Sequence, residues 1–326
     1  MFDLFSSLPV RNKEVTNSYL QTLLKIEERE LFTGVLHVQN GEKGQVVLLF
    51  QQGAQSMVYS LRDGGWRSVS KPDWKHELAQ AEGDMRVLAL PVEGLRTFRV
   101  FLELEKNEAH TSVSMNADQI PAKIADWEQT HTPSLLHVQQ HDIQAFFIVS
   151  GEPGSSLESL LVGAERFQSG AAVLAQIKSW GPRACLVTRL PTDLESPAGN
   201  EYILRMGFSS LVQKALERYQ ELAGRFLVAH LNDEINALNE QNHWSMYFSG
   251  TNIVHREFFA DTEQAGRIYR ILLEKMRSEM NLVVGSDIAA KIFTDALATL
   301  SPRPREWLEK YVPEGIPVAM KVEVKS

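Results

Sequence analysis

The chain has 326 residues, of which 44% are hydrophobic and 23% are charged, a composition typical of globular proteins with well-formed cores. Its formal net charge of −8 argues against a nucleic-acid-binding protein, because phosphate binding needs a basic face. No apolar run approaches the roughly twenty residues that span a bilayer, and Asp3 stands where a signal peptide carries positive charge. We therefore expect a cytoplasmic protein with neither a nucleic-acid nor a membrane partner.

Cys185 is the single cysteine of the chain, which excludes an intramolecular disulfide and a cysteine-rich zinc site. Its neighbours Leu186 and Val187 predict a buried strand position. The thiol is therefore expected to be an inert part of the core.

One short segment recurs at a fixed offset. Leu36-His37-Val38-Gln39 returns one hundred positions later as Leu136-His137-Val138-Gln139. The same offset relates Leu20 to Ile120, Leu24 to Ile124, Glu28 to Glu128 and Val87 to Val187. Self-similarity at a fixed period indicates repeated domains. We expect related domains over 15–112 and 113–206, preceded by an extension over 1–14 and followed by a third domain over 207–312 and a tail over 313–326.

The first copy reads as a short amphipathic helix followed by a strand hairpin. Asn17 or Ser18 is expected to cap the helix, and alternation in the first strand places Leu36 and Val38 inward and His37 outward. Residues 54–82 give no clear pattern. The expected elements are a helix over 19–26 and strands over 32–38, 45–51, 85–91 and 98–104.

The second copy repeats the helix and the hairpin, and helical spacing then runs from Leu157 to Ile177. Further strands are expected over 145–149, 184–190 and 202–206. Three histidines, His131, His137 and His141, lie in this copy. Because no carboxylate or cysteine follows them at ligand spacing, we expect surface histidines and no metal site.

Two segments of the first copy carry a family resemblance. Leu31 to Val38, and Gly44 to Phe50 with the following Gly53, resemble the strand hairpin of the PATAN family. Ile177 to Gly181 resembles that family's late segment, whereas Ala54-Gln55-Ser56 departs from its usual apolar-His-Ala step. The resemblance implies contacts between proteins in bacterial signalling assemblies. The acidic pair, aspartate and lysine of the receiver domains that accompany this family cannot be placed here.

The third part changes to helical periodicity, with an apolar stripe along one helix from Phe208 to about Leu238. This stripe is longer than the later helices, so we expect an interface for a homodimer or another protein partner. The alternative is that the hairpin from Trp244 to Phe259 folds over the stripe. The candidate interaction residues are Phe208, Leu211, Val212, Tyr219, Leu222, Phe226, Trp244, Tyr247, Phe248, Phe258 and Phe259.

The remaining helices of the third part have clear end signals. Asp261 with Gln264 is expected to cap a helix over 262–284. Gly285 should end that helix, and Ser286 should cap the next one over 287–300. Pro302 and Pro304 should end this helix, and a short segment over 307–311 should follow.

Motifs for catalysis are not found, neither a phosphate-binding glycine loop nor a nucleophile elbow. Asp233 and Glu234 lie near His230, but adjacent acids on a helix diverge, which indicates a solvated face. The sequence therefore predicts a non-catalytic interaction or scaffold protein without cofactor or metal. A small-molecule sensor binding between the repeats or at the aromatic hairpin is the alternative, and a hydrolase is the third.

The fold class expected is α/β (α+β). Two tandem α-β-β-α-β-β units are followed by a C-terminal helical bundle with an inserted β-hairpin.

Overall fold

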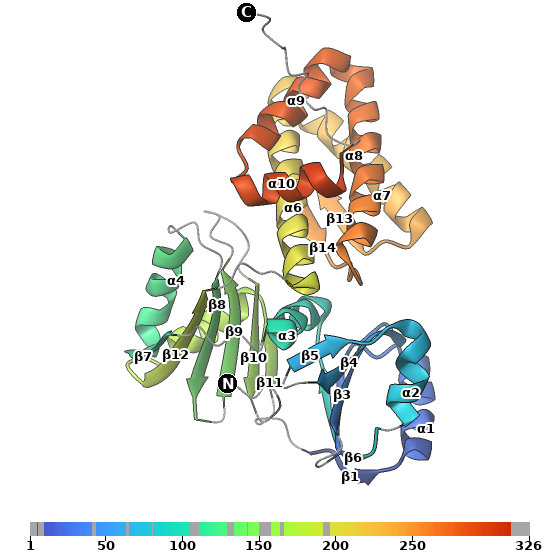
Figure 1. The fold of residues 1–326 in the computed structure, drawn as a ribbon. Helices are drawn as coiled ribbons and strands as arrows, with labels where there is room; N and C mark the ends of the chain where they lie inside the picture. The colour runs from blue at the N-terminus through green and yellow to red at the C-terminus, as the bar shows by residue number, and fades with distance from the viewer. Residues whose placement is uncertain are drawn as a thin grey trace, which may run out of the picture. The chain divides into compact units, whose positions relative to one another are not determined.

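The computed structural model describes residues 5, 10–40, 44–62, 65–79, 81–104, 111–128, 134–141, 143–149, 158–163, 166–191 and 196–313 (Figure 1). The chain divides into two compact units, unit 1 (Met1–Ala198) and unit 2 (Gly199–Ser326). Both helices and antiparallel sheets are present, so the expected mixed α/β class is confirmed. None of the described helices combines the length and apolar character needed to cross a bilayer.

In unit 1, one six-stranded antiparallel sheet of described residues, sheet A, has the order β1-β6-β2-β3-β4-β5. Its strands are β1 (Asn12–Val15), β2 (Gly34–Asn40), β3 (Gly44–Gln51), β4 (Ala54–Arg62), β5 (Gly65–Ser68) and β6 (Gly83–Ala89). Two helices, α1 (Asn17–Arg29) and α2 (Trp74–Ala79), contribute Leu20 and Leu78 to the core on one face of this sheet.

The second six-stranded sheet of the described residues, sheet B, has the order β7-β12-β8-β9-β10-β11. Its strands are β7 (Thr111–Asn116), β8 (Ser134–Gln140), β9 (Ile143–Val149), β10 (Glu158–Gly163), β11 (Arg166–Ser169) and β12 (Ala184–Pro191). The helices α4 (Ile120–Glu128) and α5 (Ala171–Ser179) cover one face with Ile124 and Ile177. The strands of sheets A and B follow one another in the same chain order from edge to edge.

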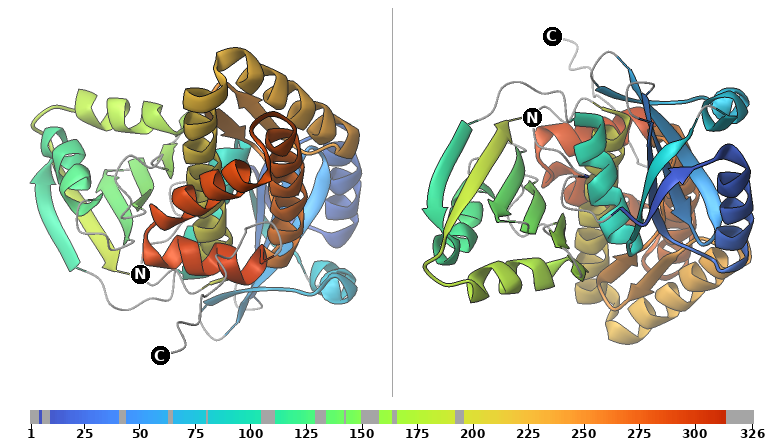
Figure 2. Two further views of the ribbon diagram at one scale, coloured as in Figure 1. Left: turned by 90° about the horizontal axis from the view of Figure 1, so that it is seen from above. Right: turned by 90° about the horizontal axis from the view of Figure 1, so that it is seen from below.

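Helix α3 (Val92–Leu104) lies between the two sheets and contacts β2 and β5 of sheet A and β9, β10 and β11 of sheet B (Figures 1 and 2). Residues 94–102 are buried on every side of this helix. The strand expected over 98–104 is therefore wrong. In this run Phe98, Val100 and Leu102 alternate with Arg99, Phe101 and Glu103, a spacing that resembles a strand although the structure forms a helix.

Two other expectations about unit 1 are also wrong in detail. The helical spacing from Leu157 to Ile177 spans the hairpin β10–β11 before α5 begins, and Leu157 itself lies outside the described residues. Because β10 is buried along its whole length, it lacks the alternation of a half-exposed strand. The unclear stretch over 54–82 forms β4, β5 and α2, and Thr16 caps α1 in place of Asn17 or Ser18. The observed order of elements therefore differs from α-β-β-α-β-β.

Unit 2 is mainly helical, and its core is formed by its own described residues. Its elements are α7 (Arg225–Asn242), β13 (Met246–Ser249), β14 (Asn252–His255), α8 (Thr262–Val284), α9 (Ser286–Ala298) and α10 (Pro302–Tyr311), preceded by α6 (Pro197–Ala223), which begins at the end of unit 1. The expected hairpin is confirmed, and so is the cap at Asp261, whose side chain accepts a hydrogen bond from the Gln264 backbone.

Several helix boundaries in this part correct the expectations. The strand expected over 202–206 is part of α6, and the single helix from Phe208 to Leu238 is interrupted at Gly224. Gly224 has φ 87° and ψ 165°, a conformation that costs an L-residue strain, so the helix ends there. Ser286 is the first residue of α9, and Gly285 takes the cap position. Pro302 begins α10, because proline fits the first turn of a helix.

Helices α6 and α8 run parallel, and their residues pair at a nearly constant offset in sequence. The rings of Phe208 and Tyr269 stack with centroids 3.9 Å apart. Further along both helices, burial and then the nearby carboxylate of Glu279 raise the pKa of Tyr219. These two pairs are 61 and 60 positions apart in the chain. The glycine corners at residues 224 and 285 are also 61 positions apart, which places both at the same end of unit 2.

Three asparagines of α7 fix the β13–β14 hairpin. The Asn236 side chain donates to the Phe248 carbonyl at 2.9 Å and accepts from the Phe248 amide at 2.8 Å. Asn232 and Asn239 donate to the carbonyls of Gly250 and Met246, each at 2.9 Å. Because these side chains satisfy backbone groups of β13, they cover one edge of the hairpin.

Candidate functional site

The predicted interaction residues divide into a buried set and an exposed set. The buried residues are Phe208, Leu211, Val212, Tyr219, Phe248, Phe258 and Phe259. Trp244 is partly buried against the core of unit 2, and the exposed residues are Leu222, Phe226 and Tyr247. Most of the stripe that was expected to provide an interface is buried, because the hairpin and the later helices pack over it, which is the alternative given above.

Five of the exposed apolar residues in the described part of unit 2 lie next to the two glycine corners. Phe226, just after the first corner, is 84% exposed, and Leu222 precedes that corner. At the second corner Leu282 is 79% exposed, and Val283 and Ile288 are also exposed. We call these five residues the corner surface. Exposed apolar groups that lie together mark contact sites more often than single ones do.

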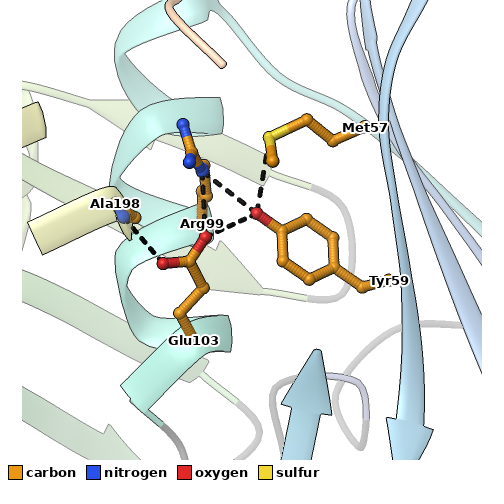
Figure 3. Close-up of polar contacts among 5 residues, drawn as sticks. All are labelled: Met57, Tyr59, Arg99, Glu103 and Ala198. Carbon is orange, nitrogen blue, oxygen red and sulfur yellow. Dashed lines mark hydrogen bonds and ion pairs between the residues drawn. The ribbon is translucent and has the colours of Figure 1, made fainter. Parts of the chain in front are cut away.

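The second feature is a polar network on the buried helix α3 (Figure 3). The Arg99 Nε donates to Glu103 Oε1 at 3.1 Å and lies 3.0 Å from the hydroxyl of Tyr59. That hydroxyl donates to the same Glu103 oxygen at 2.6 Å. Burial, more than any neighbouring charge, raises the pKa of Tyr59 well above its ordinary value, so the hydroxyl keeps its proton.

The other carboxylate oxygen of Glu103 binds the first turn of α6. Glu103 Oε2 accepts a hydrogen bond from the Ala198 backbone at 2.7 Å (Figure 3). Ala198 is the second residue of α6, and the first amides of a helix have no partner within the helix. A carboxylate at this position satisfies such an amide and favourably meets the positive end of the helix dipole. Glu103 therefore joins α3, β4 and the first turn of α6.

Two further buried ion pairs lie among the described residues. Within unit 1, Arg96 of α3 lies 3.8 Å from Glu158 of β10. Within α6, Arg205 lies 3.0 Å from Glu201, with both side chains nearly inaccessible. Breaking a buried ion pair is strongly destabilising, so these residues constrain the structure.

The repeated histidines face α3 and are buried, which corrects the expectation that they point outward. Each ring Nε2 lies 2.9 Å from a glutamine oxygen, Gln45 for His37 and Gln144 for His137. Desolvation by burial lowers the pKa of each histidine to about 4. Both faces of the sheet are covered here, which period-two alternation alone does not show.

The other groups singled out in the sequence lie in ordinary environments. His131 lies outside the described residues, and His141 occupies a turn with φ 51°. Cys185 is buried, which raises the pKa of its thiol. Glu234 pairs with Lys275 at 2.9 Å, and the hydrogen bond from Lys275 lowers the pKa of this carboxyl group. Among the described residues no cluster of histidine, cysteine and acidic side chains is arranged to hold a metal.

Sequence reasoning missed three of the five residues of the corner surface and all of the α3 network. Leu282 and Val283 belong to an apolar run directly before Gly285, at the end of α8, where both side chains are exposed. The spacing of Arg99 and Glu103, four residues apart, is a helical ion-pair signal that was hidden in an expected strand. In comparisons with known proteins, no family model, curated protein or solved structure matches the chain.

Proposed function

We propose that the chain is a non-catalytic interaction protein of bacterial regulation that carries two tandem PATAN-like domains in residues 15–206. The hundred-residue offset and the shared strand order of sheets A and B support the repeat. The equivalent placement of His37 and His137, each bonded to a glutamine of the neighbouring strand, supports it further.

The observation that carries the interaction role is the corner surface of unit 2. Burying an apolar side chain contributes roughly 1.5–3 kcal/mol, so several such residues offset much of the cost of association. Arg225 and Asp287 are exposed beside this surface and carry opposite charges. A surface with an apolar centre and both signs of charge at its edge is complementary to itself in a two-fold arrangement. We therefore propose a second copy of the chain as its partner.

Sedimentation velocity tests this proposal. The wild-type protein should form dimers at about 100 µM, and Phe226→Ser or Leu282→Ser should weaken the dimer by about tenfold or more. Both substitutions lie on exposed positions, so thermal unfolding should stay close to that of the wild type. Ile271→Ser, an exposed apolar residue elsewhere on α8, is the control and should leave the dimer intact. A wild-type protein that stays monomeric, or a dimer insensitive to both variants, overturns the proposal.

The small-molecule sensor is the second candidate function. Sheet A carries a polar cavity away from both the repeat boundary and the aromatic hairpin, and its chemistry is developed below.

A further inference from the structure

The described part of unit 1 contains a cavity of about 240 Å³ between sheet A and α2. It is lined by Val38, Gly44, Gln45, Val46, Ser60, Leu61, Arg62, His76, Glu77 and Ala81. This volume is below the roughly 300–1,000 Å³ of sites for drug-sized ligands, so it suits a small metabolite.

Two opposite charges stand side by side in this lining. Arg62 of β4 forms an ion pair with Glu77 of α2 through Nη2 and Oε1. The Arg62 Nε donates to the Ser60 hydroxyl oxygen at 2.9 Å, which fixes the orientation of the guanidinium group. Glu77 and Ser60 are buried, whereas more than half of the Arg62 side chain is exposed. The pair is thus anchored on one side and open on the other.

Each of these groups has hydrogen-bonding capacity left over. Within the described part of the chain, Arg62 Nη1 and Glu77 Oε2 make no hydrogen bond to the protein. The Ser60 hydroxyl accepts from Arg62 and keeps its own proton for another acceptor. The cavity therefore offers donors beside Arg62 and an acceptor at Glu77.

The charge balance decides which ligand fits. Because Arg62 and Glu77 neutralise each other, the cavity does not concentrate ions of one sign. A zwitterion with a carboxylate and an ammonium group complements both partners at once. The lining also includes Val38 and Val46, whose apolar side chains suit a short aliphatic side chain of the ligand.

We propose that this cavity binds a small aliphatic α-amino acid. The ligand carboxylate accepts hydrogen bonds from Arg62 and Ser60, and its ammonium group donates to Glu77. This function is independent of the corner surface in unit 2, so failure of one proposal leaves the other standing.

Isothermal titration calorimetry of the full chain with L-valine, acetate and propylamine tests the proposal. L-valine should bind, while acetate and propylamine, which carry one charge each, should bind at least about tenfold more weakly, since each loses one set of charge-assisted hydrogen bonds. No heat with L-valine in the millimolar range overturns the proposal. Equal binding of acetate and L-valine also overturns it, because the cavity would then be a simple anion site.

Substitutions locate the binding. Arg62→Met and Glu77→Gln should each weaken L-valine binding by about tenfold or more. The matched control Arg67→Met changes an exposed arginine of the neighbouring strand β5 and should leave binding unchanged. Ala81→Leu fills the cavity without altering a charge and should also abolish binding, which keeps the test valid if a charge variant fails to fold. Binding that persists in Arg62→Met and Ala81→Leu proteins places the ligand elsewhere and overturns the proposal.

Discussion

Two histidines in equivalent strands show how burial changes the chemistry of a side chain. His37 stacks on Phe5 with ring centroids 3.8 Å apart, and His137 stacks on Phe146 at 5.0 Å. In this apolar setting the charged imidazolium loses its hydration, so the neutral ring is favoured and the pKa falls to about 4. These rings therefore act as polar members of the core that are held by one glutamine each.

The stability of unit 1 should depend on pH because of these two residues. The unfolded histidines bind protons near the ordinary value of 6.5, whereas the folded ones resist protonation down to about pH 4. Unfolding therefore takes up protons, and the free energy of unfolding should fall as the pH decreases through this window. Lowering the pH from 7.5 to 5 should cost about 2 kcal/mol per histidine in urea unfolding.

Nuclear magnetic resonance of the histidine rings checks the cause. The His37 and His137 signals should not titrate until the pH is close to 4, and His37→Gln with His137→Gln should flatten the pH dependence of stability. His230→Gln, a change at an exposed histidine, serves as the control. If either buried ring titrates near pH 6.5, the burial argument is wrong.

Among the elements, α3 is the helix that packs between the two sheets of unit 1. Its apolar residues Phe98 and Phe101 pack toward aromatic partners, Phe5 on the side of sheet A and Phe146 in sheet B. The same helix carries Arg99 and Glu103 into a region that excludes water. Buried charges are tolerated there because each one is paired and hydrogen-bonded. α3 thus joins the two sheets of unit 1 and caps the first turn of α6.

Replacing Glu103 should test this arrangement. Glu103→Gln removes the negative charge that lies 3.1 Å from the buried Arg99 guanidinium, which should destabilise unit 1 by roughly 3–5 kcal/mol in chemical denaturation. The double variant Arg99→Met, Glu103→Met removes both charges and should be more stable than Glu103→Gln. Glu82→Gln, at an exposed position, should have little effect. A single variant as stable as the wild type would show that the pair contributes nothing.

At the scale of the whole molecule, the two units have separate hydrophobic cores. The core of unit 2 is formed by residues from Leu204 to Val312, and unit 1 has one core beneath each outer face of its sheets. None of these described cores shares a residue with another. The units are therefore expected to unfold in separate steps.

Calorimetry with a matched pair of leucine substitutions checks this expectation. Leu136→Ala in unit 1 and Leu272→Ala in unit 2 remove fully buried side chains, each at a cost of about 2–5 kcal/mol. Each variant should lower the transition of its own unit and leave the other in place. A single transition that shifts equally in both variants contradicts the prediction.

Local sequence patterns correctly predicted several elements of this fold. The Asp261 cap and the β13–β14 hairpin depend on interactions between residues close in sequence, so composition and spacing were sufficient to predict them. Cys185 was expected at a buried strand position, and its place in β12 confirms this, although its neighbour Leu186 is exposed.

What only the tertiary structure decided is which faces are covered and which groups meet. Short buried runs form a strand in β10 and a helix in α3, and such short runs do not reveal from the sequence which of the two they will form. Contacts such as Tyr59 with Glu103, and Glu103 with Ala198, join residues 44 and 95 positions apart, and no local pattern encodes such distances. The corner surface depends on the parallel course of α6 and α8, since two helix ends become neighbours only after packing.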